Sequence, residues 1–250
     1  MNLRYLQNLW IRCCSFSRLS GINHQELARE VVEKAVSFGA SAAGIAGIAV
    51  LRNSPSCKRS GGIVWPAGVK SVLVLALAHR AAEPELDWWG GKGGTPGNHK
   101  LQTISKDLVR CLRDTFGIRA EAIPYQPADQ GIFLKDAAVL AGLGTIGANN
   151  LLVTPQFGPR VRLRALFLDA ALSPTGPVKF SPCDGCLKNC IKACPRQAFQ
   201  DGPYDSARCR KQMREDEAKQ NIAANPSKPP AVCIKYCRAC ELSCPVGTCL

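Results

Sequence analysis

CDGCLKNCIKACP occupies residues 183–195, and CRACELSCP occupies residues 237–245. Each run ends in the dipeptide Cys-Pro, and ten of the chain's fourteen cysteines lie from residue 183 onward. Two cysteine runs that each end in Cys-Pro are typical of proteins with two iron–sulfur clusters, in which the last cysteine of each run binds the cluster of the other run. The sequence therefore predicts a protein that transfers electrons.

The interleaving of the two runs assigns four ligands to each predicted [4Fe–4S] cluster. The first cluster takes Cys183, Cys186, Cys190 and Cys244, and the second takes Cys194, Cys209, Cys237 and Cys240. Two alternatives remain open. A pair of four-cysteine zinc sites is one, because Cys-x2-Cys pairs also suit zinc, and Cys233 could replace Cys237 as a ligand. The three-cysteine runs and the two Cys-Pro endings favour clusters over zinc.

The composition indicates a protein of a reducing compartment. The 250 residues carry fourteen cysteines, and residues 1–20 lack the continuous apolar segment of a signal peptide. The longest apolar run, 72–78, is far too short to span a membrane. We therefore expect a cytoplasmic protein without membrane contact. The formal charge of +13 favours an anionic partner such as nucleic acid, a phosphorylated cofactor or an acidic electron donor, although a generally basic surface explains it equally well.

The residues before the cysteine runs alternate between helical and strand patterns. An almost continuously apolar stretch, 72–79, suits a central strand covered on both faces. The alternation implies an α/β layer fold. Pro174 and Pro177 mark a boundary, so we expect an α/β domain over 1–178 and a small cluster domain over 179–250. The spacing predicts helices over 24–38, 101–116 and 133–140 and further strands over 43–50, 118–123, 151–154 and 161–169.

Residues 142–147 read GLGTIG and match the G-x-G-x-x-G pattern of dinucleotide-binding loops. Such a loop follows a strand and opens a helix, whereas this stretch follows a predicted helix and precedes a predicted strand. We therefore expect the glycines to permit close approach to a bulky ligand or a tight backbone crossing. Tyr125, Asp129 and Lys135 precede the loop, and each could donate a proton to a reduced substrate. A solvated loop position explains each of them equally well.

The stretch KDAAVLAGLGTIGANNLLVTP at 135–155 and the stretch FGPRVRL at 157–163 resemble the epoxyqueuosine reductase family, and reductive dehalogenases share the same plan. The resemblance covers roughly residues 65–250 and includes the double Cys-Pro tail. It implies a nitroreductase-like α/β sandwich core that binds cobalamin, followed by a ferredoxin-like module that feeds electrons from two [4Fe–4S] clusters to the cobalt. The residues expected to contact the cofactor are Gly142, Gly144, Gly147, Asn149, Arg162 and His99.

Several positions depart from the family's pattern. Thr145 and Ala148 stand where the family's glycine loop usually carries an aromatic residue and a lysine. The family's catalytic Asp falls on Ala128, with Asp129 one place away. The chain also shows no counterpart of the helical-repeat extension with which some epoxyqueuosine reductases hold tRNA, so tRNA is not the favoured substrate.

We expect an oxidoreductase that accepts electrons from a ferredoxin-like or flavodoxin-like donor and passes them through two clusters to a bound cofactor. That cofactor, for which cobalamin is a candidate, would reduce a small molecule or a modified base. Two alternatives are a non-enzymatic electron carrier that activates a partner protein and a tRNA-modifying epoxyqueuosine reductase. About 180 residues precede the cysteine runs, more than a pure carrier needs, and a domain of this size more often holds a cofactor or substrate.

Overall fold

The structure is a computed structural model that describes residues 23–60, 63–90, 94–125, 127, 131–222 and 233–247. Its main sheet has four strands in the order β1-β2-β7-β4, and every neighbouring pair is antiparallel. The two inner strands, β2 and β7, are buried over nearly their whole length, so the central strand predicted at 72–79 is confirmed. The strands are β1 (Ala42–Gly47), β2 (Ser71–Ala78), β4 (Ala120–Ala122) and β7 (Val161–Leu168).

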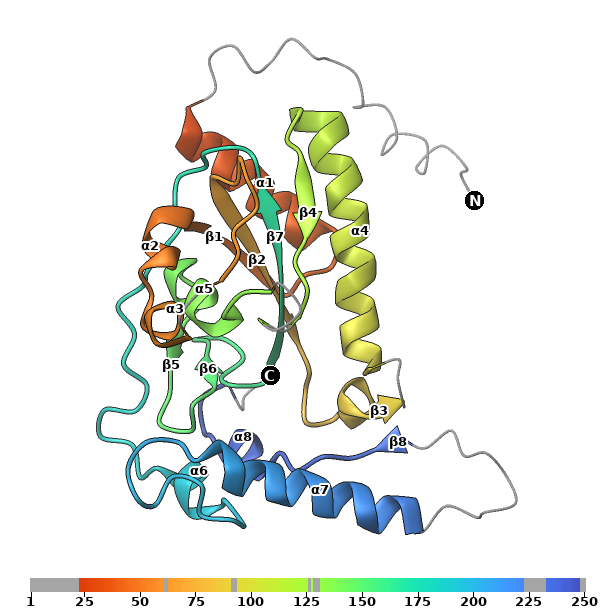
Figure 1. The fold of residues 1–250 in the computed structure, drawn as a ribbon, viewed down its shortest axis with the longest axis vertical. Coiled ribbons are helices and arrows are strands. Elements are labelled where there is room, and N and C mark those ends of the chain that lie inside the picture. Colours follow the sequence, from red (N-terminus) through yellow and green to blue (C-terminus); the bar gives the residue numbers. More distant parts are fainter. Residues whose placement is uncertain are drawn as a thin grey trace, which may run out of the picture.

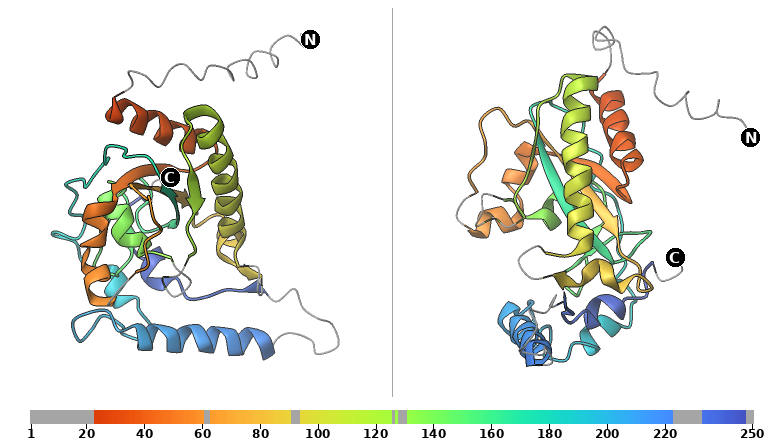
Figure 2. Two further views of the ribbon diagram at one scale, coloured as in Figure 1. Left: turned by 45° about the horizontal axis from the view of Figure 1, so that its top comes forward. Right: turned by 90° about the vertical axis from the view of Figure 1, so that its right-hand side faces the viewer.

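Helices cover both faces of this sheet, which gives three layers (right-hand view of Figure 2). On one face Leu73 and Leu75 of β2 pack against α1 and α4, and on the other Val72 and Val74 pack against α2 and α5. Successive residues of a strand point to opposite faces, which explains the continuous apolar run. The helices are α1 (His24–Ser37), α2 (Ile48–Arg52), α3 (Pro55–Ser60), α4 (Pro96–Phe116) and α5 (Leu134–Leu140).

Local capping explains where the two long helices of the core begin and end. Asn23 Oδ1 accepts the N–H groups of Gln25 and Glu26 at 2.7 and 3.0 Å, as a residue before a helix does. Helix α4 starts five residues earlier than predicted, because Thr95 Oγ1 accepts the N–H of Asn98. Gly117, with a left-handed φ of 63°, ends α4. The strand predicted over 43–50 stops at β1, since residues 48–50 open α2.

The residues from 183 to 247, which we call the cysteine module, lie at one end of the sheet (Figure 1). Strand β8 of the module pairs with β3, which follows β2 in the chain, so the module is joined to the core. None of the described helices combines the length and the apolar character needed to cross a bilayer. The remaining elements are η1 (Pro84–Asp87), β3 (Trp89–Gly90), β5 (Thr145–Ile146), β6 (Leu152–Val153), α6 (Asn189–Lys192), α7 (Ser206–Ile222), β8 (Cys233–Ile234) and α8 (Ala239–Leu242).

Candidate functional site

Eight thiols of the cysteine module lie in two groups of four. Burial raises the pKa of Cys190, and three neighbouring thiols raise it further, those of Cys244, Cys183 and Cys186. In the second group burial raises the pKa of Cys240 to about 12, and three more thiols contribute, those of Cys237, Cys194 and Cys209. Like charges that crowd together disfavour ionisation, so these shifts report proximity. The two groups coincide with the two predicted ligand sets, whose role as cluster ligands stays a prediction.

The donor sets fit iron–sulfur clusters better than zinc. Among the described residues, no three His, Cys, Asp or Glu side chains gather closely enough around one point to hold a single metal ion. A zinc ion needs all four sulfurs about 2.3 Å from one centre. The thiolates of a [4Fe–4S] cluster each bind a different iron, so they stand further apart. A cationic metal centre also relieves the repulsion that raises these thiol pKa values.

Cys237 lies beside its predicted partners. Its pKa is raised first by burial and then, among other charges, by the thiols of Cys194 and Cys209. Cys233, the alternative ligand, lies in β8, where it pairs with Gly90 of β3. This arrangement supports Cys237 as the member of the second group.

Backbone N–H groups point at sulfur atoms of the first group. The N–H of Ala148 donates to Cys183 Sγ at 3.3 Å, and the N–H of Lys188 donates to Cys186 Sγ at 3.4 Å. Hydrogen bonds of this kind tune the reduction potential of a bound cluster. Ala148 directly follows the glycine loop, so the loop lies against the first group of thiols.

The glycine loop is a tight backbone crossing. Helix α5 precedes the loop and β5 lies inside it, which is the wrong order for a dinucleotide site. Gly142 has a left-handed φ of 76°, and a Cβ there would lie 2.8 Å from Thr175 O. A Cβ at Gly147 would lie 2.6 Å from Val153 Cγ2 and 3.6 Å from Cys183 Sγ. Both glycines therefore face protein atoms, and their contact with a cofactor stays a prediction.

Gly144→Ala is expected to destabilise the fold by about 3 kcal/mol, the upper end of the cost of overpacking. The added Cβ would lie 2.1 Å from Val153 O, a backbone atom that cannot move without disturbing the β5–β6 pairing. Gly90→Ala is the matched control, because among the described residues its Cβ would meet only Gly94 O, at 3.7 Å. Urea unfolding under anaerobic conditions measures both, and a cost below about 1 kcal/mol for Gly144→Ala would show that the crossing relaxes.

A cavity of about 540 Å³ lies between the core and the cysteine module. Three of the predicted site residues line it: Tyr125, Lys135 and Arg162. Its volume is within the range of ordinary ligand sites, roughly 300–1,000 Å³. The structure thus brings together residues from the loop after β4, from α5 and from β7 at the edge of the module.

The predicted proton donors differ in their surroundings. Burial lowers the pKa of Lys135, against the opposing charge of Asp136, and Lys135 Nζ donates to Asn150 O at 2.6 Å. Tyr125 is half exposed, and the guanidinium of Arg164 lies 4.8 Å from its ring centroid. Of the three candidates, Lys135 is therefore the one whose ionisable group is held in the cavity wall, and its role as a proton donor stays a prediction. Asp129 lies outside the described residues.

His99 lies away from this cavity wall. It occupies the first turn of α4 and is exposed. It is not one of the described residues that line the 540 Å³ cavity. Asn149 lies deeper, being 3% exposed, and its Nδ2 donates to Cys240 O at 3.3 Å. Asn149 therefore binds the backbone of the cysteine module.

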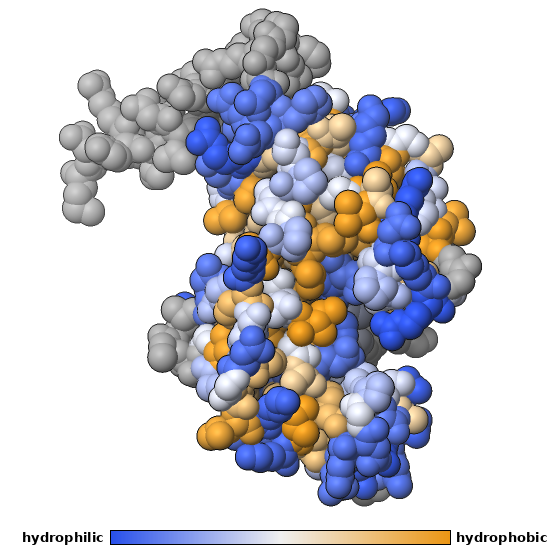
Figure 3. Space-filling model, turned by 90° about the vertical axis from the view of Figure 1, so that its left-hand side faces the viewer, coloured by the Kyte–Doolittle hydropathy of each residue, from blue (hydrophilic) through white to orange (hydrophobic). Residues whose placement is uncertain are grey.

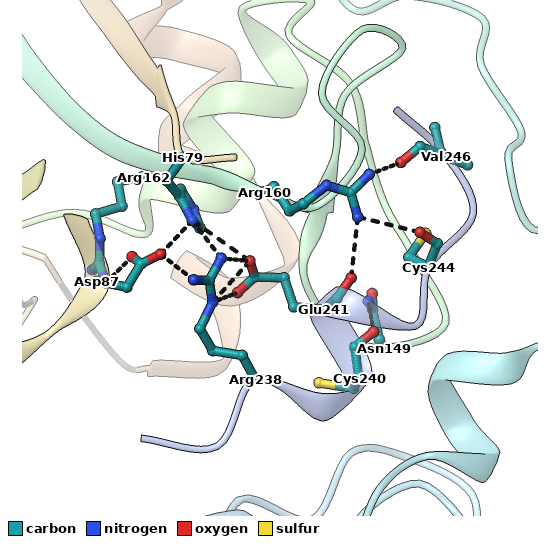
Figure 4. Close-up of polar contacts among 10 residues, drawn as sticks. All are labelled: His79, Asp87, Asn149, Arg160, Arg162, Arg238, Cys240, Glu241, Cys244 and Val246. Carbon is teal, nitrogen blue, oxygen red and sulfur yellow. Dashed lines mark hydrogen bonds and ion pairs between the residues drawn. The ribbon is translucent and has the colours of Figure 1, made fainter. Parts of the chain in front are cut away.

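A buried ion network, which the sequence did not reveal, joins the core to the cysteine module (Figure 4). Asp87 Oδ2 lies 2.5 Å from His79 Nδ1 and 2.5 Å from Arg238 Nη1. Asp87 also forms a close ion pair with Arg162, and Arg238 forms one with Glu241. His79 and Asp87 come from the end of β2 and from η1, whereas Arg238 and Glu241 belong to the second cysteine run.

The network keeps Asp87 ionised. Burial by itself would raise the pKa of Asp87, but the facing His79 and the guanidinium groups of Arg162 and Arg238 outweigh it and lower the pKa. The side chain of Asp87 is 3% exposed, so its charge is screened little by water. Within the described residues, Arg162 Nε is buried without a hydrogen-bond partner. Because Arg162 lines the 540 Å³ cavity, it is a donor available to a ligand.

Arg160 directly precedes β7 and binds the C-terminal part of the cysteine module. Its guanidinium donates to the carbonyl oxygens of Glu241 at 3.4 Å and Cys244 at 3.2 Å, and makes a third, closer bond to that of Val246 (Figure 4). These carbonyls follow or end α8, where a cation is favourable. Arg160 therefore fixes the segment that carries Cys244.

A second cavity, of about 240 Å³, is lined by the second group of thiols. Four residues line both this cavity and the 540 Å³ cavity: Lys135, Leu151, Arg238 and Glu241. A cluster held by the second group would therefore be separated from a ligand in the larger cavity by one layer of side chains. The first group lines neither cavity among the described residues, so it lies further from the ligand site.

The chain is similar to known proteins both in sequence and in fold. No family model matches the chain. It is 48% identical over 73 residues to the tetrachloroethene reductive dehalogenase of Desulfitobacterium hafniense, covering 28% of this chain and 13% of that protein. It is 30% identical over 151 residues to the epoxyqueuosine reductase of Leadbetterella byssophila, covering 57% of this chain and 47% of that protein. The chain is a relative of both.

The solved structures of both kinds of relative share the fold. A crystal structure of epoxyqueuosine reductase with a modified tRNA stem loop matches 90% of this chain and 66% of that one, with a TM-score of 0.64 and 21% identity. A catabolic reductive dehalogenase in complex with 3-bromo-4-hydroxybenzoic acid matches 90% of this chain and 32% of that one, with a TM-score of 0.62 and 16% identity. The predicted resemblance is confirmed, as is a mixed helix–strand fold common to both families.

The matches cover only part of each curated relative. The chain spans less than half of the length of the curated relatives it matches. The named relatives are reductases, and their activity applies to this chain only as a proposal. Their substrates, cofactors and partners enter below as proposals.

Proposed function

We propose that this protein is an iron–sulfur reductase in which two [4Fe–4S] clusters deliver electrons to a cofactor in the 540 Å³ cavity, with cobalamin as the candidate. The observation that carries the proposal is the shared wall of the two cavities, because one layer of side chains separates the second group of thiols from the ligand site. We further infer that the core is nitroreductase-like and that the cysteine module is of the ferredoxin type.

The cavity of about 540 Å³ would enclose only part of a ligand as large as cobalamin, and its lining suits polar groups. Arg162 offers a buried Nε that has no hydrogen-bond partner in the described part of the chain, and Lys135 offers a second cationic donor. Trp89, Tyr125 and Tyr236 add aromatic surface to the same wall. When bound, cobalamin would supply a metal centre that accepts single electrons and reduces an electrophilic substrate.

The chain's own residues would orient the ligand and supply the proton. Lys135 Nζ, held at the carbonyl oxygen of Asn150, lines the cavity, and its pKa is lowered by burial. An ammonium group with a lowered pKa donates its proton more readily than a free one, which is the property required of a general acid near neutral pH. The network around Asp87 holds Arg162 and Arg238 in place in the lining of the same cavity.

The test is an anaerobic titration of the reconstituted protein with cob(II)alamin, followed by EPR spectroscopy. Wild-type protein is expected to convert the signal to the base-off form, and Arg162→Gln to weaken binding about tenfold through the lost charged hydrogen bond. Arg110→Gln, on the exposed face of α4, is the matched control and should bind as wild type does. Two intact clusters with an unchanged cobalamin signal would contradict the proposal and favour a different cofactor or an electron carrier.

A tRNA substrate is the second candidate, and it rests on the solved relative with a bound tRNA stem loop together with the formal charge of +13. Binding through phosphate contacts would weaken steeply as salt is raised. A gel-shift titration of this chain with tRNA at two salt concentrations measures that dependence, and the absence of a shift at low salt would remove the candidate.

A further inference from the structure

The loop that carries the first group of thiols also carries an exposed apolar side chain among lysines. Leu187 is 74% exposed and follows Cys186 directly. Lys188 and Lys192 are exposed on the same loop and on α6, and the N–H of Lys192 bonds to Lys188 O, one turn away. We call Leu187, Lys188 and Lys192 the loop patch. Figure 3, which faces the side of the molecule where α6 lies, shows apolar atoms among polar ones over its lower part.

The loop patch is positively charged, and no ion pair between described residues uses its lysine side chains. The ion pairs formed by the described residues of the module involve Arg196, Arg208 and Arg238, and none of them includes a lysine of the patch. Between residues 179 and 192 the chain carries three lysines and one acidic residue, Asp184. An apolar centre with a charged rim is the usual composition of a protein–protein contact.

The outer face of α7 differs from the loop patch. It also carries exposed basic residues, Lys211 and Arg214, but no large exposed hydrophobic residue occurs among the side chains of α7 that the structure describes. The helix lies beside the second group of thiols through Cys209. The described surface of α7 therefore offers charged side chains without a large exposed apolar one, whereas the loop patch offers both.

The position of the two thiol groups relative to the cavity indicates that electrons would enter through the first group, at the loop patch. The second group lines the cavity next to the ligand site, and the first group does not. Lys188 is bonded through its N–H to Cys186 Sγ at 3.4 Å, so the patch surface is in direct contact with the first group. Electron transfer slows steeply with distance, and a donor bound at the loop patch would stand nearest to the first cluster.

We propose that the loop patch docks an acidic one-electron carrier protein, which reduces the first cluster. The inference rests on the proposed function. In this step the reduced carrier loses one electron and the oxidised first cluster gains it, and no bond forms or breaks. The acidic surface of the carrier faces Lys188 and Lys192, and Leu187 packs against an apolar residue beside the carrier's own redox centre.

The test measures cluster reduction by stopped-flow absorbance, with a reduced acidic ferredoxin as the probe and the reconstituted full chain as the acceptor. Lys188→Glu/Lys192→Glu is expected to lower the second-order rate constant at least tenfold at low ionic strength and to remove its decrease with added salt. Leu187→Ser is expected to lower the rate at low and high ionic strength alike. Reduced methyl viologen, a small cation that needs no docking site, should reduce all variants no more slowly than wild type.

Lys211→Glu/Arg214→Glu is the matched control, since it makes the same change of charge on α7 and should alter the ferredoxin rate less than about twofold. If the two charge-reversed variants lost the same fraction of the ferredoxin rate constant, net charge alone would explain the effect, and the proposal would be overturned. An unchanged rate in the loop-patch variants, or wild-type protein that methyl viologen reduces and ferredoxin does not, would also overturn it. Failure of the wild type to assemble clusters would instead contradict the proposed function.

Discussion

Cys244→Ser is expected to remove about half of the protein's iron, from about eight to about four atoms per chain, and to leave the second cluster intact. The reason is that Cys244 lies with Cys190 and its neighbours, although α7 and the first two cysteines of the second run separate them in the chain. A cubane that loses one of its four thiolates is exposed to solvent and is lost. Iron and sulfide content after anaerobic reconstitution measure the effect, and Cys111→Ser on α4 is the control that should keep the full content.

Double variants identify which cluster is lost. Cys190→Ser added to Cys244→Ser should remove no further iron, because both changes affect one cluster. Cys237→Ser added to Cys244→Ser should remove nearly all of the iron, because the two changes affect different clusters. The opposite pattern would show that Cys244 belongs to the second cluster and that the interleaved assignment is wrong.

Asp87→Asn is expected to cost about 3–5 kcal/mol of the free energy of unfolding, the typical cost of removing one partner of a buried ion pair. Asp87 neutralises Arg162, which forms no ion pair with any other described carboxylate. Asp87 also faces Arg238 and His79. Asparagine keeps the shape of the side chain and removes the charge. Anaerobic urea unfolding, followed by circular dichroism, measures the loss.

The control for Asp87→Asn is Asp107→Asn, which removes an exposed i,i+3 pair with Arg110 and should cost less than about 1 kcal/mol. Combining Asp87→Asn with Arg162→Met should cost less than the sum of the two single changes, because the double variant buries no unpaired guanidinium at that position. Additive costs, or a loss below about 1 kcal/mol for Asp87→Asn alone, would show that the network does not hold the module to the core.

The sequence was informative wherever local chemistry decides the outcome. Cysteine spacing predicted the same two sets of thiols that crowd together in the structure, and apolar periodicity predicted β2, α4 and α5 within a few residues. The order of helix and strand around Gly142 was sufficient to reject a dinucleotide loop. In each case the deciding residues are close together in the chain or repeat with the period of one element.

The ion network escaped prediction because its members are distant in the chain. His79 follows a strand and Asp87 lies in a short helical turn, and neither position shows a pattern. Arg238 and Glu241 stand between predicted ligand cysteines, and the cysteines alone explain the pattern of the run. The pairing of β3 with β8, together with the hydrogen bonds of Arg160 and Asn149, brings the two halves together. The one available signal was the presence of both charges inside the second run.

Because each thiol group combines cysteines from both runs, the order in which the chain is synthesised limits when a cluster can assemble. Each group takes cysteines from both sides of α7, so a chain that is still emerging from the ribosome with only residues up to 195 exposed can complete neither set. On the proposed ligand assignment, neither cluster can be completed before the second run has been synthesised, so the cysteine module should pass through a cluster-free state until then.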